Sequence, residues 1–165
     1  MISRSMSVIV RNVERVTVTH KQYYHFLRAR SESETAAYRP GMYEKREEEH
    51  GWMMDLYKEW HVGDAKSKEM IARRYVERFI GCVENVTNPK CEMTNQEKRA
   101  EIKKMLANPR VGKMVKVARP RSFYMKVMLL PVRWKSTWLT YLEAKVITFV
   151  KTKNTKLFTK LKAGR

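Results

Sequence analysis

Lys and Arg side chains alternate with aromatic ones in the last third of this 165-residue sequence, a combination suited to binding an anionic partner. Residues 110–165 hold fifteen Lys and Arg and a single acid, Glu143, out of a net charge of +18 for the whole chain. Membranes rich in acidic lipid and nucleic acids are the two common partners for a basic, partly apolar surface. A helical domain with a basic outer face and no dedicated partner would have the same composition.

The side chains expected to contact a membrane lie between residues 119 and 145. Apolar anchors would enter the boundary between headgroups and acyl chains, while bases would meet acidic headgroups. The predicted anchors are Phe123, Met128, Trp134 and Trp138, and the predicted bases are Arg119, Arg121, Lys126, Arg133, Lys135 and Lys145. A membrane partner predicts that the anchors and Leu130 are exposed, whereas a nucleic-acid partner predicts hidden apolar residues. The longest apolar run, 127–132, is far short of the roughly 20 residues that span a bilayer.

Motifs for catalysis and metal binding are absent from the sequence. It has no Gly-rich phosphate loop, Asp-x-Asp pair, His-Glu-x-x-His or nucleophile elbow. Cys82 and Cys91 have no second pair beside them and are predicted to be reduced thiols rather than zinc ligands or a disulfide. We therefore expect no catalytic residue, no metal ligand and no complete active site in this chain.

A loop with possible phosphate-binding chemistry follows the aromatic residues 23–26. It contains Arg28, Arg30 and Ser31. Arg can hold phosphate oxygens bidentately, and hydroxyl or backbone N–H groups complete such a site. A solvated loop in which Ser33 or Thr35 caps a helix explains the same residues equally well.

The periodicity of the chain predicts a mainly α fold, with a short N-terminal β segment followed by a bundle of five or six helices. The β segment is expected within residues 7–26, where β-branched residues gather. The helices are expected at about 42–60, 64–86, 94–107, 111–118, 122–130 and 136–151, with a last turn or two at 155–162. Pro131 is expected to end the fifth of these helices. The chain divides into residues 1–35, a helical bundle at 36–109 and a basic amphipathic tail at 110–165.

Apolar stripes mark one face of each of three predicted helices. In the first helix the stripe is Trp52, Met53, Leu56 and Trp60. The second helix has the clearest stripe, formed by Ala72, Tyr75, Val76, Phe79, Ile80 and Val83. In the helix at 136–151 the stripe is formed by Trp138, Leu139, Leu142, Val146, Phe149 and Val150.

Residues 14–33, with the sequence ERVTVTHKQYYHFLRARSES, resemble the last strand and following loop of bacterial family 2 glycosyltransferases. The helical region from Met42 and the basic, proline-punctuated end are similar to the C-terminal extension of family members that build capsular and other surface polysaccharides. The resemblance implies that Arg28, Arg30 and Ser31 lie near the phosphates of a nucleotide-sugar donor.

The nucleotide-sugar domain, its metal site and its catalytic base would lie before Met1. The resemblance therefore implies a truncated or separate C-terminal region, and the divalent metal and nucleotide sugar would belong to the missing domain. It also implies an upstream catalytic domain as a partner and a cytoplasmic location, peripheral at the inner face of the cell membrane. A basic helical nucleic-acid-binding protein is the alternative.

Overall fold

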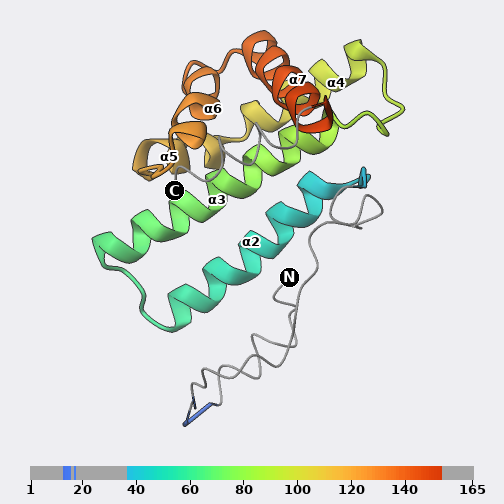
Figure 1. The fold of residues 1–165 in the computed structure, drawn as a ribbon. Helices are drawn as coiled ribbons and strands as arrows, with labels where there is room; N and C mark the ends of the chain where they lie inside the picture. The colour runs from blue at the N-terminus through green and yellow to red at the C-terminus, as the bar shows by residue number, and fades with distance from the viewer. Residues whose placement is uncertain (1–12, 16, 18–36, 154–165) are drawn as a thin grey trace.

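The computed structural model describes residues 13–15, 17 and 37–153, and this part of the chain is mainly α, as predicted (Figure 1). Its helices are α2 (Met42–Glu59), α3 (Ala65–Val86), α4 (Asn95–Ala107), α5 (Pro109–Val117), α6 (Phe123–Arg133) and α7 (Thr137–Lys153). Most of the predicted β segment and the predicted turn at 155–162 lie outside the described residues.

Side-chain caps set the beginnings of the central helices. Asp64 Oδ1 accepts a hydrogen bond from Ser67 N at 2.9 Å, where α3 begins. At α4, Thr94 N donates to Glu97 Oε2 at 2.7 Å, and Glu97 N donates to Thr94 Oγ1 at 3.2 Å. The starts predicted near residues 64 and 94 are therefore confirmed. They could be predicted because each cap bonds to a residue only three positions along the chain.

α6 continues beyond Pro131, which was expected to end it. Proline has no N–H, so one hydrogen bond of the helix is lost at this position. The last turn still closes, because Trp134 N donates to Leu130 O at 3.2 Å and Lys135 N donates to Val132 O at 3.0 Å. The prediction was wrong because a proline in the last turn removes one bond but does not prevent the following residues from closing the helix.

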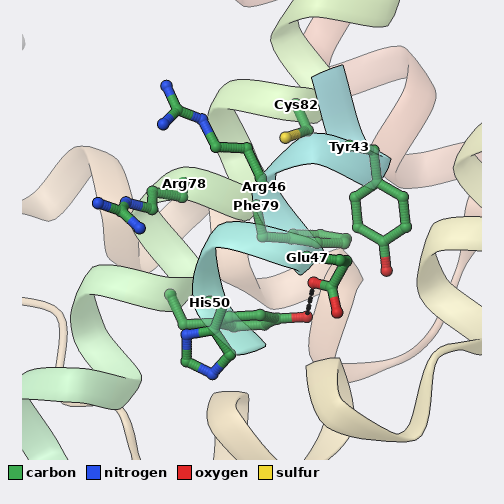
Figure 2. A pocket seen from close by; sticks show the side chains of 8 residues that line it. Tyr43, Arg46, Glu47, His50, Arg78, Phe79 and Cys82 are labelled. Atoms are coloured by element: carbon green, nitrogen blue, oxygen red, sulfur yellow. Dashed lines mark hydrogen bonds between the residues drawn. The ribbon is translucent and has the colours of Figure 1, made fainter. Parts of the chain in front are cut away.

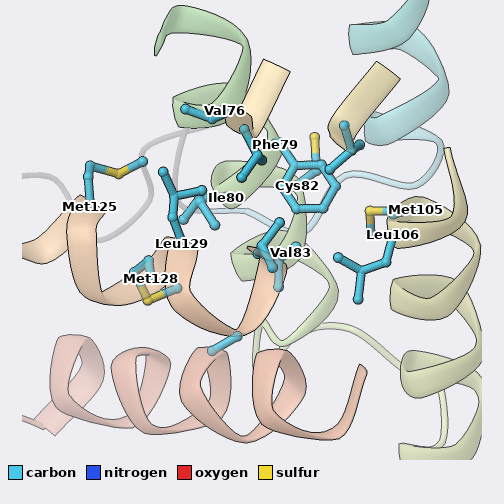
Figure 3. Close-up of a cluster of buried hydrophobic side chains, with 14 of the residues drawn as sticks. Val76, Phe79, Ile80, Cys82, Val83, Met105, Leu106, Met125, Met128 and Leu129 are labelled. Carbon is cyan, nitrogen blue, oxygen red and sulfur yellow. The ribbon is translucent and has the colours of Figure 1, made fainter. Parts of the chain in front are cut away.

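α3 is the central helix, and it packs against α2, α4, α5, α6 and α7. Its predicted apolar face is confirmed, since all six residues of that face are buried. Figure 3 shows Phe79, Ile80 and Val83 of this face beside side chains of α4 and α6. The buried cluster extends from residue 72 to residue 144, on both sides of the boundary predicted at 109/110. Residues 110–144 therefore pack as part of the bundle.

The apolar stripe predicted for α2 does not form part of this core. Trp52 and Trp60 are exposed, and the buried residues of α2 are Glu49 and His50. The apolar end of α2 is joined by a short loop to the start of α3, where the sequence is polar and the first buried residue is Ile71. The predicted stripe consequently has little apolar surface to pack against.

Candidate functional site

The outer face of α6 is apolar and exposed. Phe123, Leu130 and Trp134 follow one another at helical spacing, and Phe123 and Trp134 are 72% and 68% exposed. The opposite face of the same helix contributes Leu129 and Val132 to the core. α6 is thus apolar on both sides, and the core requires only one of them.

α7 has a similar arrangement. Its inner face is made of small or polar residues, Thr140, Tyr141 and Ala144, and Tyr141 Oη donates to Asn95 Oδ1 of α4 at 2.7 Å. Most of the apolar stripe recognised in the sequence points outward, with Trp138 58% exposed and Leu142 and Val146 also exposed, whereas Val150 packs against the core. Small inner residues let the helix pack closely, so its larger apolar side chains remain at the surface. We call Phe123, Leu130, Trp134, Trp138, Leu142 and Val146 the outer apolar face.

Exposed bases accompany the outer apolar face. They are Arg119, Arg121, Lys126, Arg133, Lys135 and Lys145. Within the described part of the chain, none of these six lies within ion-pair distance of a carboxylate. Lys145 Nζ instead lies 5.5 Å from the centre of the Tyr141 ring. The outer apolar face is therefore accompanied by positive charge that no acidic side chain among the described residues neutralises.

Glu143 is the one acid on α6 and α7, and its environment favours the neutral carboxylic acid. Its Oε2 atom is buried and has no hydrogen-bond partner among the described residues. Burial raises the pKa of Glu143 from the ordinary 4.5 to about 7. At neutral pH this residue therefore cancels only part of one positive charge.

The structure places nine of the ten predicted membrane-contacting residues at the surface and corrects the tenth. Met128 is only 1% exposed and lies in the core, so its side chain cannot serve as an anchor. The prediction was wrong there because a helix that is apolar all round does not reveal which side faces inward. Leu142 and Val146 were recognised as apolar but were given no role at the surface.

Arg28, Arg30 and Ser31 lie outside the described residues. Their predicted contact with donor phosphates therefore stays a prediction.

A polar cluster between α2 and α3 is the main rival site (Figure 2). Glu47 is at its centre, and the carboxylate accepts hydrogen bonds from Tyr75 Oη at 2.6 Å, Asn108 Nδ2 at 3.0 Å and Arg110 Nη1 at 2.9 Å. The His50 ring lies 4.7 Å from the Tyr75 ring, centre to centre. These contacts connect α2 to α3 and to the start of α5.

The cavity in this cluster is too small to hold a substrate. Its volume is about 10 Å³, which is about the space that one water molecule needs. Burial lowers the pKa of His50 to about 4 and raises the pKa of Cys82 to about 12, so both are neutral near pH 7. The cluster offers neither room for a substrate nor a thiolate, and we assign it a structural role.

The described residues contain neither a candidate metal site nor a candidate membrane-spanning helix. No group of three or more His, Cys, Asp or Glu side chains there could hold a metal ion. None of the described helices combines the length and the apolar character needed to cross a bilayer.

Comparisons with known protein families, with curated proteins and with solved structures give no match to this chain.

Proposed function

We propose that the chain binds the surface of anionic membranes through α6 and α7, with the outer apolar face entering the headgroup boundary. The observation that supports this most directly is the exposure of Phe123, Trp134 and Trp138 beside bases that have no acidic partner in the described structure. Large exposed apolar patches on soluble domains usually mark interaction sites, because in water they lower solubility without stabilising the fold.

The estimated free energies suit reversible attachment. Burying about 100 Å² of each of the three aromatic anchors would contribute roughly 2.5 kcal/mol apiece. Each base near an acidic leaflet adds about 1 kcal/mol before losses from screening and ordering. The two contributions are of similar size, so the aromatic residues and the bases both strengthen the proposed binding.

The same exposure disfavours the alternative of a nucleic-acid partner. Phosphate contacts require bases, but they give no reason for Phe123 and Trp134 to remain in water. Base stacking could use aromatic residues, yet the exposed aliphatic side chains Leu130, Leu142 and Val146 offer no stacking surface.

The resemblance to family 2 glycosyltransferases remains a second-level proposal. Its motif lies in residues 14–33, of which the structure describes few, and the membrane proposal does not depend on it. If the chain is the C-terminal region of such an enzyme, α6 and α7 would hold a catalytic domain at the inner face of the membrane. A genomic reading frame upstream of Met1 that encodes a nucleotide-sugar domain would support this, and a stop codon close to Met1 would oppose it.

Two tryptophans offer a matched test of the membrane proposal. Trp134 is the C-cap of α6 and Trp60 is the C-cap of α2; both are exposed, and each precedes a residue with φ of 52°. Trp134→Ser should weaken binding to vesicles of phosphatidylcholine and phosphatidylglycerol by up to about 70-fold, the equivalent of the roughly 2.5 kcal/mol lost with the burial of one large ring. Trp60→Ser should change it less than twofold. Vesicle sedimentation gives both values.

The salt dependence of binding distinguishes a membrane partner from a nucleic-acid partner. Binding to acidic vesicles should weaken between 0.1 and 1 M salt but persist, because screening acts on the bases and not on the aromatic side chains. Affinity for nucleic acid would instead fall linearly on a log–log plot against salt. If the chain does not bind acidic vesicles and shifts DNA or RNA in a gel at physiological salt, the membrane proposal is wrong.

A further inference from the structure

A basic groove lies where the start of α3 meets the segment that joins α5 to α6. Its volume is about 810 Å³, and its lining includes five bases: Lys66, Lys68, Lys116, Arg119 and Arg121. They come from two stretches, 66–68 and 116–121, which are about fifty residues apart in sequence. Three of these bases, Lys66, Lys68 and Lys116, were given no role in the sequence analysis because only the fold brings them close to Arg119 and Arg121.

The acids near the groove are already engaged. Glu69 Oε1 accepts hydrogen bonds from Arg73 Nε and from Arg119 N, both at 3.2 Å. Asp64 Oδ1 caps α3 through Ser67 N. Among the described residues, no carboxylate forms an ion pair with any of the five bases. The groove therefore has a net positive charge that a bound anion would offset.

The segment bearing the two arginines is held at both ends. Ala118 is buried before it, and Ser122 is buried after it and accepts a hydrogen bond from Met125 N at 3.2 Å. Pro120 restricts the backbone between Arg119 and Arg121. Together with the bond from Arg119 N to Glu69, these contacts preorganise the backbone, which lowers the entropy cost of binding an anion.

We propose that this groove binds the headgroup of a lipid carrying two phosphate groups. Arg side chains hold phosphate oxygens bidentately, and basic pockets beside a membrane face suit polyphosphorylated or paired-phosphate headgroups. Five bases around about 810 Å³ provide more charge and space than one phosphate needs. A lipid is favoured over a soluble phosphate because Phe123, two residues beyond Arg121, is exposed and would meet the acyl chains. This inference rests on the membrane function proposed above and adds a preferred lipid to it.

Vesicles with equal anionic charge per lipid test this preference. One set contains 20% phosphatidylglycerol and the other 10% cardiolipin, each in phosphatidylcholine, so that only the pairing of phosphates differs. The wild-type chain should bind cardiolipin vesicles at least fivefold more tightly. Lys68→Gln with Lys116→Gln removes two groove bases that lie outside the proposed membrane-contacting set, and should make the two affinities equal.

Lys45→Gln with Lys58→Gln is the matched control. It makes the same change in net charge on α2, which lies on the opposite side of α3 from α6 and α7 (Figure 1). This variant should keep the preference for cardiolipin, and both double variants should bind phosphatidylglycerol vesicles alike. Equal binding of the two lipids by the wild type, or a preference that survives Lys68→Gln with Lys116→Gln, would overturn the groove proposal.

Binding of inorganic pyrophosphate tests the groove independently of the proposed membrane function. Titrated into the chain in solution, it should shift the amide NMR signals of residues 66–69 and 116–121 saturably, and the groove variant should abolish the shifts. Failure of the wild type to bind either vesicle would refute the membrane function, while saturable pyrophosphate binding would still support the groove as a paired-phosphate site. Absence of saturable shifts, or equal weakening by the α2 control, would refute the groove.

Discussion

The helices on the two sides of α3 differ in net charge and in which side chains they expose. α2, on one side, contains six acidic and three basic residues, whereas residues 123–153, on the other, contain six basic residues and one acidic residue. α2 directs polar groups inward, and Glu47 satisfies three donors there. α6 and α7 direct large apolar side chains outward.

This difference separates what the fold requires from what it does not. Glu47, which α2 directs inward, is paired with three donors, whereas Nε2 of the buried His50 has no hydrogen-bond partner among the described residues. The outward tryptophans of α6 and α7 contribute little to the core and lower solubility, so stability gives no reason for them. The opposite charges of the two sides also predict how the protein would be oriented on a membrane. The basic, apolar side would face an acidic bilayer, and the acidic α2 would face away from it.

Replacing Glu47 should show the largest contribution on the α2 side. Glu47→Leu leaves Tyr75, Asn108 and Arg110 without their shared acceptor, and should lower the free energy of unfolding by about 3 kcal/mol. Urea denaturation measures this loss. Glu48→Leu, at an exposed neighbouring position, and Trp138→Ser, on the other side, should each cost less than about 0.5 kcal/mol. A loss from Glu47→Leu as small as theirs would remove the distinction between the two sides.

His50 should make the α2 side sensitive to acid. Its pKa is about 4 in the fold, where burial disfavours the charged ring, against 6.5 ordinarily. The unfolded chain thus binds the extra proton between pH 6.5 and 4, and stability that is complete above pH 6.5 is lost as the pH falls through this window. The loss is on the order of 2 kcal/mol.

His50→Phe keeps a ring beside Tyr75 and removes the titration. Its stability should therefore vary less between pH 7 and pH 4 than that of the wild type. Denaturation midpoints at these two pH values provide the test, and an unchanged pH profile would mean that His50 is solvated in the native protein.

Glu143 should give the α6–α7 side a smaller pH dependence of the opposite sign. Its pKa of about 7 lies above the ordinary 4.5, so the native state holds the proton more tightly than the unfolded chain. The resulting stability is complete below pH 4.5 and is lost as the pH rises through 7. Glu143→Gln should raise stability at pH 8 by about 1 kcal/mol, since partial solvation reduces the effect, and should leave it unchanged at pH 4.

Glu92→Gln, at an exposed position before α4, is the control for this change. An increase in stability at pH 8 of the same size in both variants would indicate a general effect of net charge. Chemical denaturation at the two pH values distinguishes these outcomes.

Sequence patterns predicted those structural features that depend on residues close together in the chain. The caps of α3 and α4 involve residues three positions apart, and the buried face of α3 follows from its helical period. The patterns did not predict that Glu47 is satisfied by Asn108 and Arg110, because those partners lie more than sixty residues away. For the same reason the basic groove was visible only in part, through Arg119 and Arg121.

The apolar helices were the hardest to orient from sequence. α6 is apolar on both sides, so its period does not choose between them, and most of the apolar stripe of α7 lies on its exposed side. Bases were placed correctly at the surface because an unpaired charge is costly to bury, whereas Met128 was misplaced because its neighbours on every side are apolar. The candidate site was therefore predictable in its charges and less so in its anchors.

The buried carboxyl of Glu143 has a consequence for the docked protein. A leaflet with a surface potential of about −30 mV concentrates protons, so the pH at its surface is about half a unit below that of the bulk. A group with a pKa of about 7 is then largely protonated next to such a surface at a bulk pH of 7. We expect the apparent pKa of Glu143 to rise by about half a unit on acidic vesicles, as a carboxyl NMR titration would show. The protons gathered by an acidic membrane would then stabilise the fold of the helices bound to it.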